Sequence, residues 1–397
     1  MRLPAVSMAF SSSSLKSVFF SAPMLSMICC GLDAPASTLV TASSCSSQAS
    51  DISASVCPRC LAISFRAMIW PWTRVTSSAC RKRGLTCEFW LAEEKETERI
   101  AKAGFPYRIL KTRWDALEDE LPVMKQRLQA QPVDWLVVDS YCATVRYLAE
   151  LNRMVPVFYV DDFRREHYEV SALLQYIPCR ERQKTPEGLH EKDGVQYLTG
   201  FLYAPLREEF SRLSFDKPRE KSILLSTGGT DPYNMAGRIL AYGTRMQELQ
   251  DYLWHVIVGS MNRNENMLRE LAAANPKIIL HKNIPDMWRY MQQCEAAVSA
   301  GGTTLLELCA CGIPTVCFAF ADNQLEFAEE MAEHNLLIYA GDVREKDDAP
   351  HVICENLVCY TKDAGKRAQS FERMRRLVDG KGAERIAAFL QQYKRDV

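Results

Sequence analysis

Two glycine pairs in this sequence stand where an apolar strand-like segment gives way to a helix-like one, an arrangement that can hold a phosphate. The first lies in Ser-Thr-Gly-Gly-Thr-Asp, residues 226–231, and the second in Ser-Ala-Gly-Gly-Thr-Thr, residues 299–304. Glycine lets the backbone approach a ligand closely, and the first amides of a following helix attract an anion. Such turns in one domain favour nucleotide binding, although each alone is also compatible with a tight connection.

In the first turn, Gly228 and Gly229 are followed by Thr230 and Asp231. Thr230 can offer its hydroxyl and amide to a phosphate, or it can cap the helix together with Asp231. The turn is not a Walker loop, because no Gly-Lys-Ser/Thr follows.

The second turn adds a carboxylate to the same arrangement. Gly301, Gly302 and Thr303 precede a helix whose free amides, from Gly302 to Thr304, are expected to attract a diphosphate. Glu307 lies about one turn into that helix, where a carboxylate can accept hydrogen bonds from both ribose hydroxyls. The alternative is that Glu307 is a capping-box partner of Thr303 or Thr304.

Further polar side chains follow other apolar segments. Asp322, Asn323 and Gln324 can read sugar hydroxyls or form a helix N-cap. The carboxylates of Asp139, Asp161 and Asp162 can orient a catalytic histidine, bind sugar, or cap helices. The histidine nearest such a site is His167, a weak catalytic candidate, whereas His255 and His281 lie in predicted strands and are interpreted as core or edge residues.

The elements that position these residues alternate between strand and helix. Predicted strands in the second half are residues 222–226, 253–258, 277–280, 296–299, 315–318 and 336–339, with helices between them. In the first half, strands are predicted at 87–91, 107–110, 135–138, 155–160 and 196–202, helices at 115–129 and 145–152, and a surface loop at 180–193. The pattern is typical of an α/β protein with two Rossmann-like domains, whose ligands bind at the carboxyl ends of parallel strands. The expected domains are 81–214, incomplete at its start, and 215–397.

Composition excludes several classes of partner. The 397 residues carry a formal net charge of -1, so no overall field attracts nucleic acid or an anionic membrane. No run of about 20 apolar residues predicts a membrane-spanning helix. The 15 cysteines, many of them in apolar segments, indicate a reducing cytoplasm. The sequence carries no indication of oligomeric state.

Residues 1–80 differ in character from the rest. This segment is rich in serine and shows neither helical nor alternating periodicity, so we predict an irregular segment, disordered or aberrantly translated. Its single Cys-x-x-Cys, Cys57 to Cys60, has no second pair or nearby histidine and is interpreted as incidental.

Eight short sequence strings in the rest of the chain are VVDSY (137–141), YVDDF (159–163), YAPLREEF (203–210), GGTD (228–231), SAGGTTLLE (299–307), CGIPTV (311–316), DNQ (322–324) and VDGKGAERI (378–386). Taken together and in this order, they resemble the UDP-sugar hydrolase family of pseudaminic acid biosynthesis, and more distantly the GT-B N-acetylglucosaminyl transferase of peptidoglycan synthesis. The resemblance runs from about residue 81 to the end.

The resemblance implies hydrolysis of UDP-2,4-diacetamido-2,4,6-trideoxy-β-L-altropyranose to UDP and free sugar, with no metal or cofactor. It implies that Thr230 and the Gly301–Thr303 turn hold the diphosphate and that the backbone of Ile284 lies beside uracil. It further implies that Glu307 binds the ribose and that Asn323 and Gln324 bind the hexose.

One family feature is absent: no Gly-x-Gly-His turn, which would carry the presumed catalytic histidine, occurs in the chain. Either residues 1–80 are an aberrant translation that destroyed this turn, which we favour, or the protein is a catalytically altered relative. Three functions therefore remain: a UDP-sugar hydrolase, a GT-B glycosyltransferase with a UDP-sugar donor, or a non-catalytic UDP-sugar-binding remnant.

Overall fold

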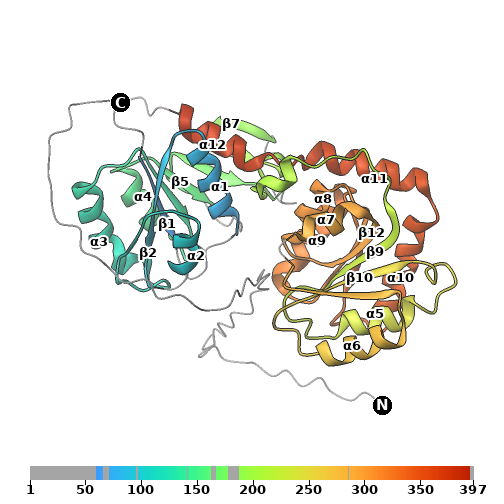
Figure 1. Ribbon diagram of the computed structural model, residues 1–397. Helices are drawn as coiled ribbons and strands as arrows, with labels where there is room; N and C mark the ends of the chain where they lie inside the picture. The colour runs from blue at the N-terminus through green and yellow to red at the C-terminus, as the bar shows by residue number, and fades with distance from the viewer. Residues whose placement is uncertain are drawn as a thin grey trace, which may run out of the picture.

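The computed structural model describes residues 60–65, 71–94, 97–140, 142–161, 167–177, 187–284 and 286–393, and these form two α/β domains (Figure 1). No helix in this part of the chain combines the length and the apolar character that crossing a bilayer requires.

The N-terminal domain contains, among the described residues, an eight-stranded sheet in the order β3-β2-β1-β4-β5-β6-β8-β7. Neighbouring strands pair parallel, except that β7 and β8 are antiparallel. Strands β4, β5 and β6 are buried along their whole length, as expected for parallel strands covered on both faces. The strands are Cys60–Phe65 (β1), Thr86–Leu91 (β2), Tyr107–Ile109 (β3), Trp135–Asp139 (β4), Val157–Val160 (β5), Ala172–Gln175 (β6), Gly188–Lys192 (β7) and Val195–Thr199 (β8).

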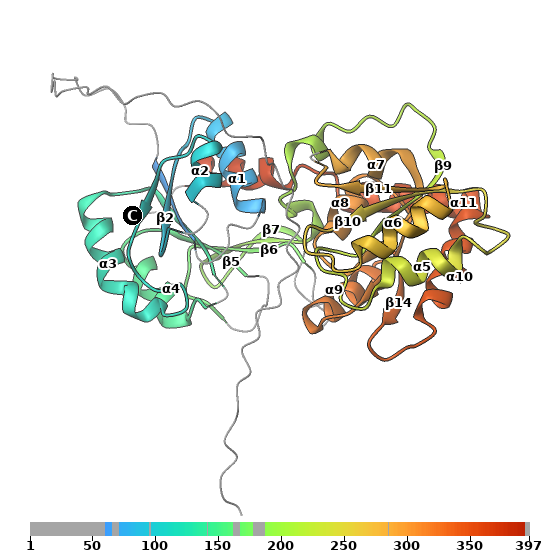
Figure 2. The ribbon, with the colours of Figure 1, turned by 60° about the horizontal axis from the view of Figure 1, so that its bottom comes forward.

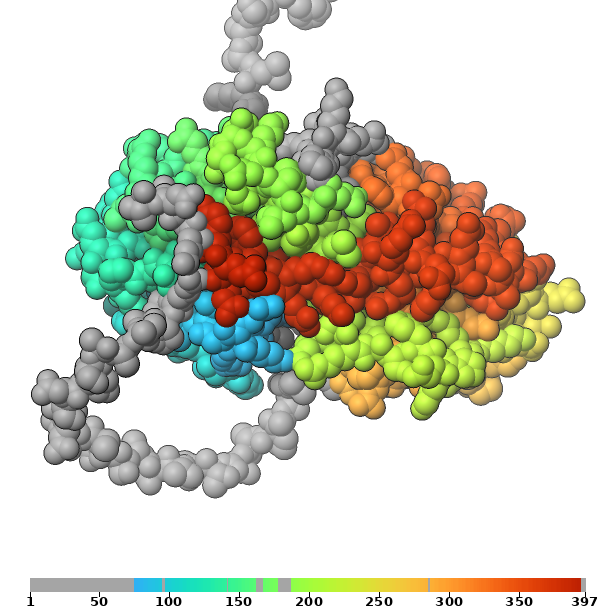
Figure 3. Space-filling view, turned by 90° about the horizontal axis from the view of Figure 1, so that it is seen from above, coloured from blue at the N-terminus to red at the C-terminus, as the bar shows by residue number. Residues whose placement is uncertain are grey.

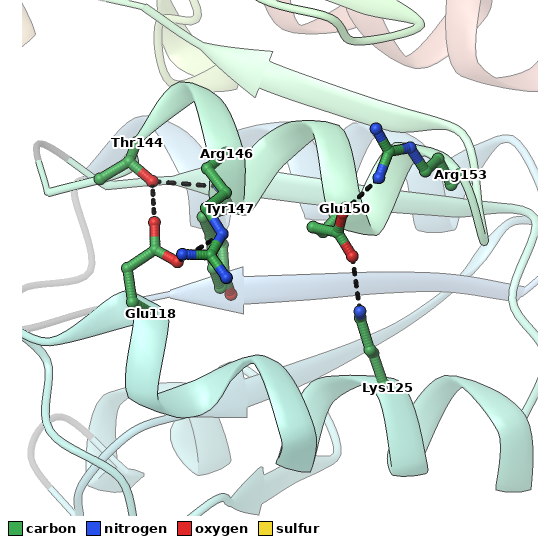
Figure 4. Close-up of polar contacts among 7 residues, drawn as sticks. All are labelled: Glu118, Lys125, Thr144, Arg146, Tyr147, Glu150 and Arg153. Carbon is green, nitrogen blue, oxygen red and sulfur yellow. Dashed lines mark hydrogen bonds and ion pairs between the residues drawn. The ribbon is translucent and has the colours of Figure 1, made fainter.

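The helices of this domain are α1 (Pro71–Lys82), α2 (Thr97–Lys102), α3 (Leu117–Ala130) and α4 (Val145–Asn152). Helix α4 begins where the Thr144 hydroxyl oxygen accepts a hydrogen bond from the Tyr147 amide at 3.0 Å. Polar contacts tie it to α3, including Lys125 to Glu150 at 2.6 Å (Figure 4). These side chains remain partly exposed to solvent, which weakens their ion pairs, so we expect packing between α3 and α4 to stabilise the two helices more than their charges do.

The prediction that residues 1–80 are irregular is wrong for β1 and most of α1. Strand β1 lies in the middle of the sheet and pairs with both β2 and β4, while α1 packs against α12. A six-residue strand has no periodicity to detect, and long-range pairing determines its structure. The N-terminal domain thus has a strand and a helix where its first unit was expected to be missing. Residues 1–59, Cys57 included, and the connection 66–70 lie outside the described residues.

The predicted loop at 180–193 is also wrong in its second part, because residues 188–192 form β7. Asp193 and Gly194 both have positive φ, 53° and 77°, which is the backbone of a two-residue hairpin turn. This Asp-Gly pair was the signal for the hairpin.

The C-terminal domain has, in the described part of the chain, a six-stranded parallel sheet in the order β11-β10-β9-β12-β13-β14, confirming the predicted alternation. Its strands are Glu220–Ser226 (β9), Leu253–Val258 (β10), Ile278–Lys282 (β11), Cys294–Ala300 (β12), Thr315–Ala319 (β13) and Ile338–Asp342 (β14). Its helices are Met235–Gly243 (α5), Glu265–Ala274 (α6), Met287–Gln293 (α7), Thr304–Ala310 (α8), Asp322–Glu333 (α9), Ala349–Thr361 (α10) and Ala364–Leu377 (α11), and α12 (Gly382–Gln392) returns to the N-terminal domain.

The two domains meet at a joint made of two chain segments, residues 200–219 and 378–382. A Cβ atom on Gly382 would lie 2.1 Å from the carbonyl oxygen of Ala204, and one on Gly380 would lie 2.2 Å from that of Phe210. The two backbones are therefore in direct contact, and only glycine fits at these positions. Figure 3 shows the C-terminal helices as a red band across both domains.

Candidate functional site

Three turns meet at the carboxyl edge of the C-terminal sheet, after the neighbouring strands β9, β12 and β13. A Cβ on Gly228, in the turn after β9, would contact the Phe320 ring at 4.0 Å, and Phe320 follows β13. A Cβ on Gly301, after β12, would lie 3.0 Å from the Cβ of Gln324 on α9. The sheet order thus brings together three motifs that are separated by up to about a hundred residues in the sequence, at the edge where ligands of such sheets bind.

In the first turn, the backbone requires glycine and the acid caps a helix. Gly228 has φ +81°, in the region that favours glycine. The buried Asp231 carboxylate accepts hydrogen bonds from the Met235 and Ala236 amides at 2.7 and 3.0 Å. Burial raises the pKa of Asp231, although these two bonds oppose the rise. Asp231 is therefore a helix cap, and half-buried Thr230 is left as the polar side chain of the turn that can face a ligand.

The second turn offers fewer free amides than expected. The Gly301 amide donates to the Phe318 carbonyl and the Gly302 amide to the Ala300 carbonyl, both at 2.8 Å. The expectation that the Gly302 amide is free is therefore wrong, because the turn uses it internally. Thr303 and Thr304 stand at the first positions of α8, where amides have no intrahelical acceptor.

Glu307, on α8, contacts an arginine from the interdomain joint. The Arg207 guanidinium lies 3.4 Å from the Glu307 carboxylate, and both side chains are mostly buried. Thr303, the N-cap residue of α8, makes no side-chain capping hydrogen bond, so the capping-box alternative is not realised. Burial raises the pKa of Glu307, while Arg207 opposes the rise. No local pattern indicates this pair, because its members are 100 residues apart in the sequence.

At the start of α9, the three polar residues of the DNQ string have different surroundings. The Gln324 side chain is buried, and its carbonyl oxygen accepts a hydrogen bond from the Phe320 amide at 3.0 Å, so it holds the turn after β13. Asn323 is exposed, and Asp322 forms an ion pair with Arg344 at 2.7 Å. Of the three, Asn323 is best placed to meet a ligand.

Ile284 lies at the same edge of the sheet, just after β11. It is half-buried, and it follows Asn283, whose φ of +54° turns the chain out of the strand. Strand β11 is separated from β9 by β10, so a ligand extending from the glycine turns toward Ile284 must cross the end of β10.

The N-terminal domain places buried polar side chains at the carboxyl ends of β4, β5 and β6. Asp139 ends β4 and Asp161 follows β5; both are buried. The Gln175 amide donates to the Asp161 carboxylate at 3.0 Å. Figure 2 draws β6 and β7 on the side of this domain nearest the C-terminal domain. His167 is exposed, and Asp162 lies outside the described residues.

Two other histidines form a pair within the C-terminal sheet. His255 Nδ1 and His281 Nε2 are 2.9 Å apart, and the Tyr290 ring lies 4.2 Å from the ring of His281. Burial lowers the pKa of both, that of His281 to about 4. They stand inside β10 and β11 and not among the turns, which confirms their interpretation as core or edge residues.

Comparisons with known proteins agree with this architecture. Residues 208–347 match the family described as "Glycosyl transferases group 1". Among curated proteins, the chain is 25% identical over 173 residues to the "Spore coat polysaccharide biosynthesis protein SpsG" of Bacillus subtilis, covering 43% of this chain and 50% of that protein. It is 30% identical over 135 residues to the "Uncharacterized protein MJ1062" of Methanocaldococcus jannaschii, covering 32% of this chain and 28% of that protein. The chain thus spans about half the length, or less, of these relatives.

Solved structures extend the likeness to most of the chain. MurG of Acinetobacter baumannii superposes with a TM-score of 0.60 at 12% identity, covering 85% of this chain and all (100%) of that one. The spinosyn rhamnosyltransferase SpnG gives 0.57 at 14% identity, covering 84% and 99%. At such identities the likeness establishes the fold, which is that of the GT-B glycosyltransferases.

Proposed function

We propose that this chain, which has the two-domain GT-B fold, binds a UDP-sugar at the carboxyl edge of its C-terminal sheet. Thr230 and the turn from Gly301 to Thr303 would hold the diphosphate, and Glu307 the ribose. Uracil would lie along the backbone at Ile284, and the hexose beside Asn323 and Gln324. The observation that carries this proposal is the meeting of two glycine turns and the start of α9 after three neighbouring strands.

Physical chemistry supports the assignment of the diphosphate and of the ribose. A diphosphate is stabilised by unpaired amides and by the positive end of a helix dipole, both of which the start of α8 supplies at Thr303 and Thr304. A carboxylate that accepts from two hydroxyls suits a ribose. Two structures of similar fold, the "S. aureus MnaA-UDP co-structure" and SpnG "complexed with thymidine diphosphate", contain nucleoside diphosphates.

For the reaction, we propose hydrolysis of UDP-2,4-diacetamido-2,4,6-trideoxy-β-L-altropyranose. Water would form a bond to the anomeric carbon while the bond from that carbon to the β-phosphate oxygen breaks. UDP would leave with the bonding electron pair, and the proton lost by water would pass to a base. Buried Asp161, oriented by Gln175, is the described carboxylate best suited to hold that water, with exposed His167 as the alternative.

Binding is tested first, by calorimetric titration of the full chain with UDP. Glu307→Gln keeps the shape of the side chain but removes its charge. Charge-assisted hydrogen bonds contribute about 1.5 to 3 kcal/mol, so UDP affinity should fall more than about tenfold. Affinity for 2′,3′-dideoxy-UDP should fall less. Equal losses for the two nucleotides would show that Glu307 does not contact ribose. Glu270→Gln, at an exposed carboxylate on α6, is the matched control and should leave affinity unchanged.

A glycosyltransferase is the second candidate, because residues 208–347 match the glycosyltransferase family. Both activities use the same nucleotide site, so only the fate of the sugar separates them. A hydrolase releases UDP and free sugar without an added acceptor, whereas a transferase requires one.

A third outcome is binding without turnover. A positioned acid-base group contributes about 10²–10⁴ in rate, and the sequence lacks the Gly-x-Gly-His turn of the resembling family. We therefore expect UDP release far slower than about 1 s⁻¹. Faster release that Asp161→Asn abolishes would instead identify Asp161 as the base.

A further inference from the structure

Arg207 reaches the proposed nucleotide site from outside the C-terminal sheet. It lies between two short 3-10 helices of the interdomain joint, Phe201–Tyr203 and Glu208–Ser211. Its guanidinium is 3.4 Å from the Glu307 carboxylate, and the exposed fractions of the two side chains are 21% and 19%. A charged pair so shielded interacts more strongly than one on the surface.

The segment that carries Arg207 is held on several sides. The Arg207 guanidinium lies 5.3 Å from the centre of the Phe210 ring, and the Phe210 carbonyl touches Gly380. The next residue, Glu208, forms an ion pair with Lys82 at the end of α1 in the N-terminal domain. Arg207 is therefore fixed by both domains, whereas Glu307 belongs to the C-terminal domain alone.

We infer that Arg207 is a positioning residue of the nucleotide site: it holds the Glu307 carboxylate so that this group can accept hydrogen bonds from a ribose. The inference rests on the function proposed above. An ionised carboxylate can accept about four hydrogen bonds. One contact from Arg207 leaves enough acceptor capacity for two ribose hydroxyls. Arg207 would act through Glu307, without touching the ligand.

The charges around Glu307 define a pH dependence. Burial and the nearby Glu209 both raise the pKa of Glu307, and Arg207 lowers it. Two further cations near α8, Arg219 and Arg375, donate instead to backbone carbonyls at its C-terminal end. Loss of Arg207 should therefore let Glu307 take up a proton at higher pH, and a protonated carboxyl is a weaker acceptor for the ribose.

The test measures the dissociation constant of UDP for the full chain by calorimetry between pH 6 and pH 9. Arg207→Met should weaken binding about tenfold near pH 7, a loss of about 1.4 kcal/mol. The ratio of variant to wild-type dissociation constants should grow as the pH falls, and this ratio cancels the titration of UDP itself. Arg207→Lys keeps the charge and should restore the wild-type pH profile. The control is Arg212→Met, which removes an exposed arginine of the same segment that pairs with Glu208, and it should change binding less than twofold.

The same substitutions in a Glu307→Gln background separate positioning from direct contact. If Arg207 acts through Glu307, Arg207→Met should add almost nothing there, and the pH dependence of the ratio should disappear. A loss that persists in this background would mean that Arg207 binds the ligand itself, and the inference would be wrong. It would also be wrong if Arg207→Met bound like wild type while Glu307→Gln showed its expected loss.

If the wild-type chain bound no UDP, the proposed function would fail and this inference with it. Thermal unfolding of each variant checks folding, and Arg207→Lys keeps the test valid if Arg207→Met does not fold.

Discussion

Gly301→Ala tests whether the second glycine turn and the start of α9 are packed so closely that one depends on the other. The added methyl carbon would lie 3.0 Å from the Gln324 Cβ, 3.2 Å from the Gln324 carbonyl oxygen and 3.5 Å from the Ala328 Cβ. Non-bonded carbon atoms prefer about 3.5 to 4.0 Å, so the first turn of α9 must move by about half an ångström or more.

The size of the effect follows from this crowding. Overpacking of a well-packed site destabilises by about 1 to 3 kcal/mol. In a domain of this size, each 1 kcal/mol lowers Tm by about 2 to 4 °C, so we expect a fall of about 2 to 12 °C. Gln324 holds the turn at Phe320, so a shift of Gln324 should also lower UDP affinity. A loss equal to the contribution of one hydrogen bond would be about tenfold.

The assays are calorimetric titration with UDP and thermal unfolding of the full chain. Gly365→Ala is the matched control: this glycine lies in the first turn of α11, where the nearest contact for a Cβ is the exposed Asp363 carboxylate at 3.3 Å. Alanine favours a helix over glycine, so this variant should keep its UDP affinity and its Tm. Unchanged affinity and Tm in Gly301→Ala would show that the turn and α9 are not coupled.

Two further predictions concern the joint and the histidine pair. Gly382→Ala would place a Cβ 2.1 Å from the Ala204 carbonyl, so we expect the two domains to unfold in separate calorimetric transitions at a lower onset temperature; a single unchanged transition would contradict this. The folded-state pKa values of His255 and His281 lie below their ordinary 6.5, that of His281 at about 4, so the unfolded chain binds more protons between these values. Stability should therefore be full above about pH 6.5 and fall as the pH drops toward about 4. His281→Asn should flatten that fall, as denaturant titrations at several pH values would show.

The C-terminal domain was predictable because each of its motifs is local. A strand, a glycine turn and a helix follow one another within about 15 residues, and their periodicity and turn residues are visible in the sequence. Parallel order then brings the ends of β9, β12 and β13 to one edge. Where sequence left alternatives, local hydrogen bonds decided between them: Asp231 caps α5, whereas Glu307 does not cap α8.

The features that sequence did not predict depend on contacts between distant segments. Strand β1 is a short apolar run whose pairing with β2 and β4 determines its structure. The pairing of Arg207 with Glu307 joins residues 100 positions apart, and neither residue carries a local sign of the other. The close approach of Gly382 to Ala204 is of the same kind, since the sequence around a glycine cannot reveal which distant backbone it touches.

Binding and catalysis therefore have different structural requirements in this fold. The proposed nucleotide site is built within one domain, and its parts are held by short-range contacts such as the Gly301 packing on Gln324. In the proposed reaction the catalytic group comes instead from the N-terminal domain, where Gln175 on the neighbouring strand β6 donates a hydrogen bond to Asp161, and this group must be aligned across the joint. Arg207 belongs to that joint and contacts Glu307, so a change in the joint can reach the proposed nucleotide site through this ion pair. For this reason, loss of turnover with retained UDP affinity would localise a defect to the N-terminal domain, whereas loss of both would localise it to the joint or to the C-terminal turns.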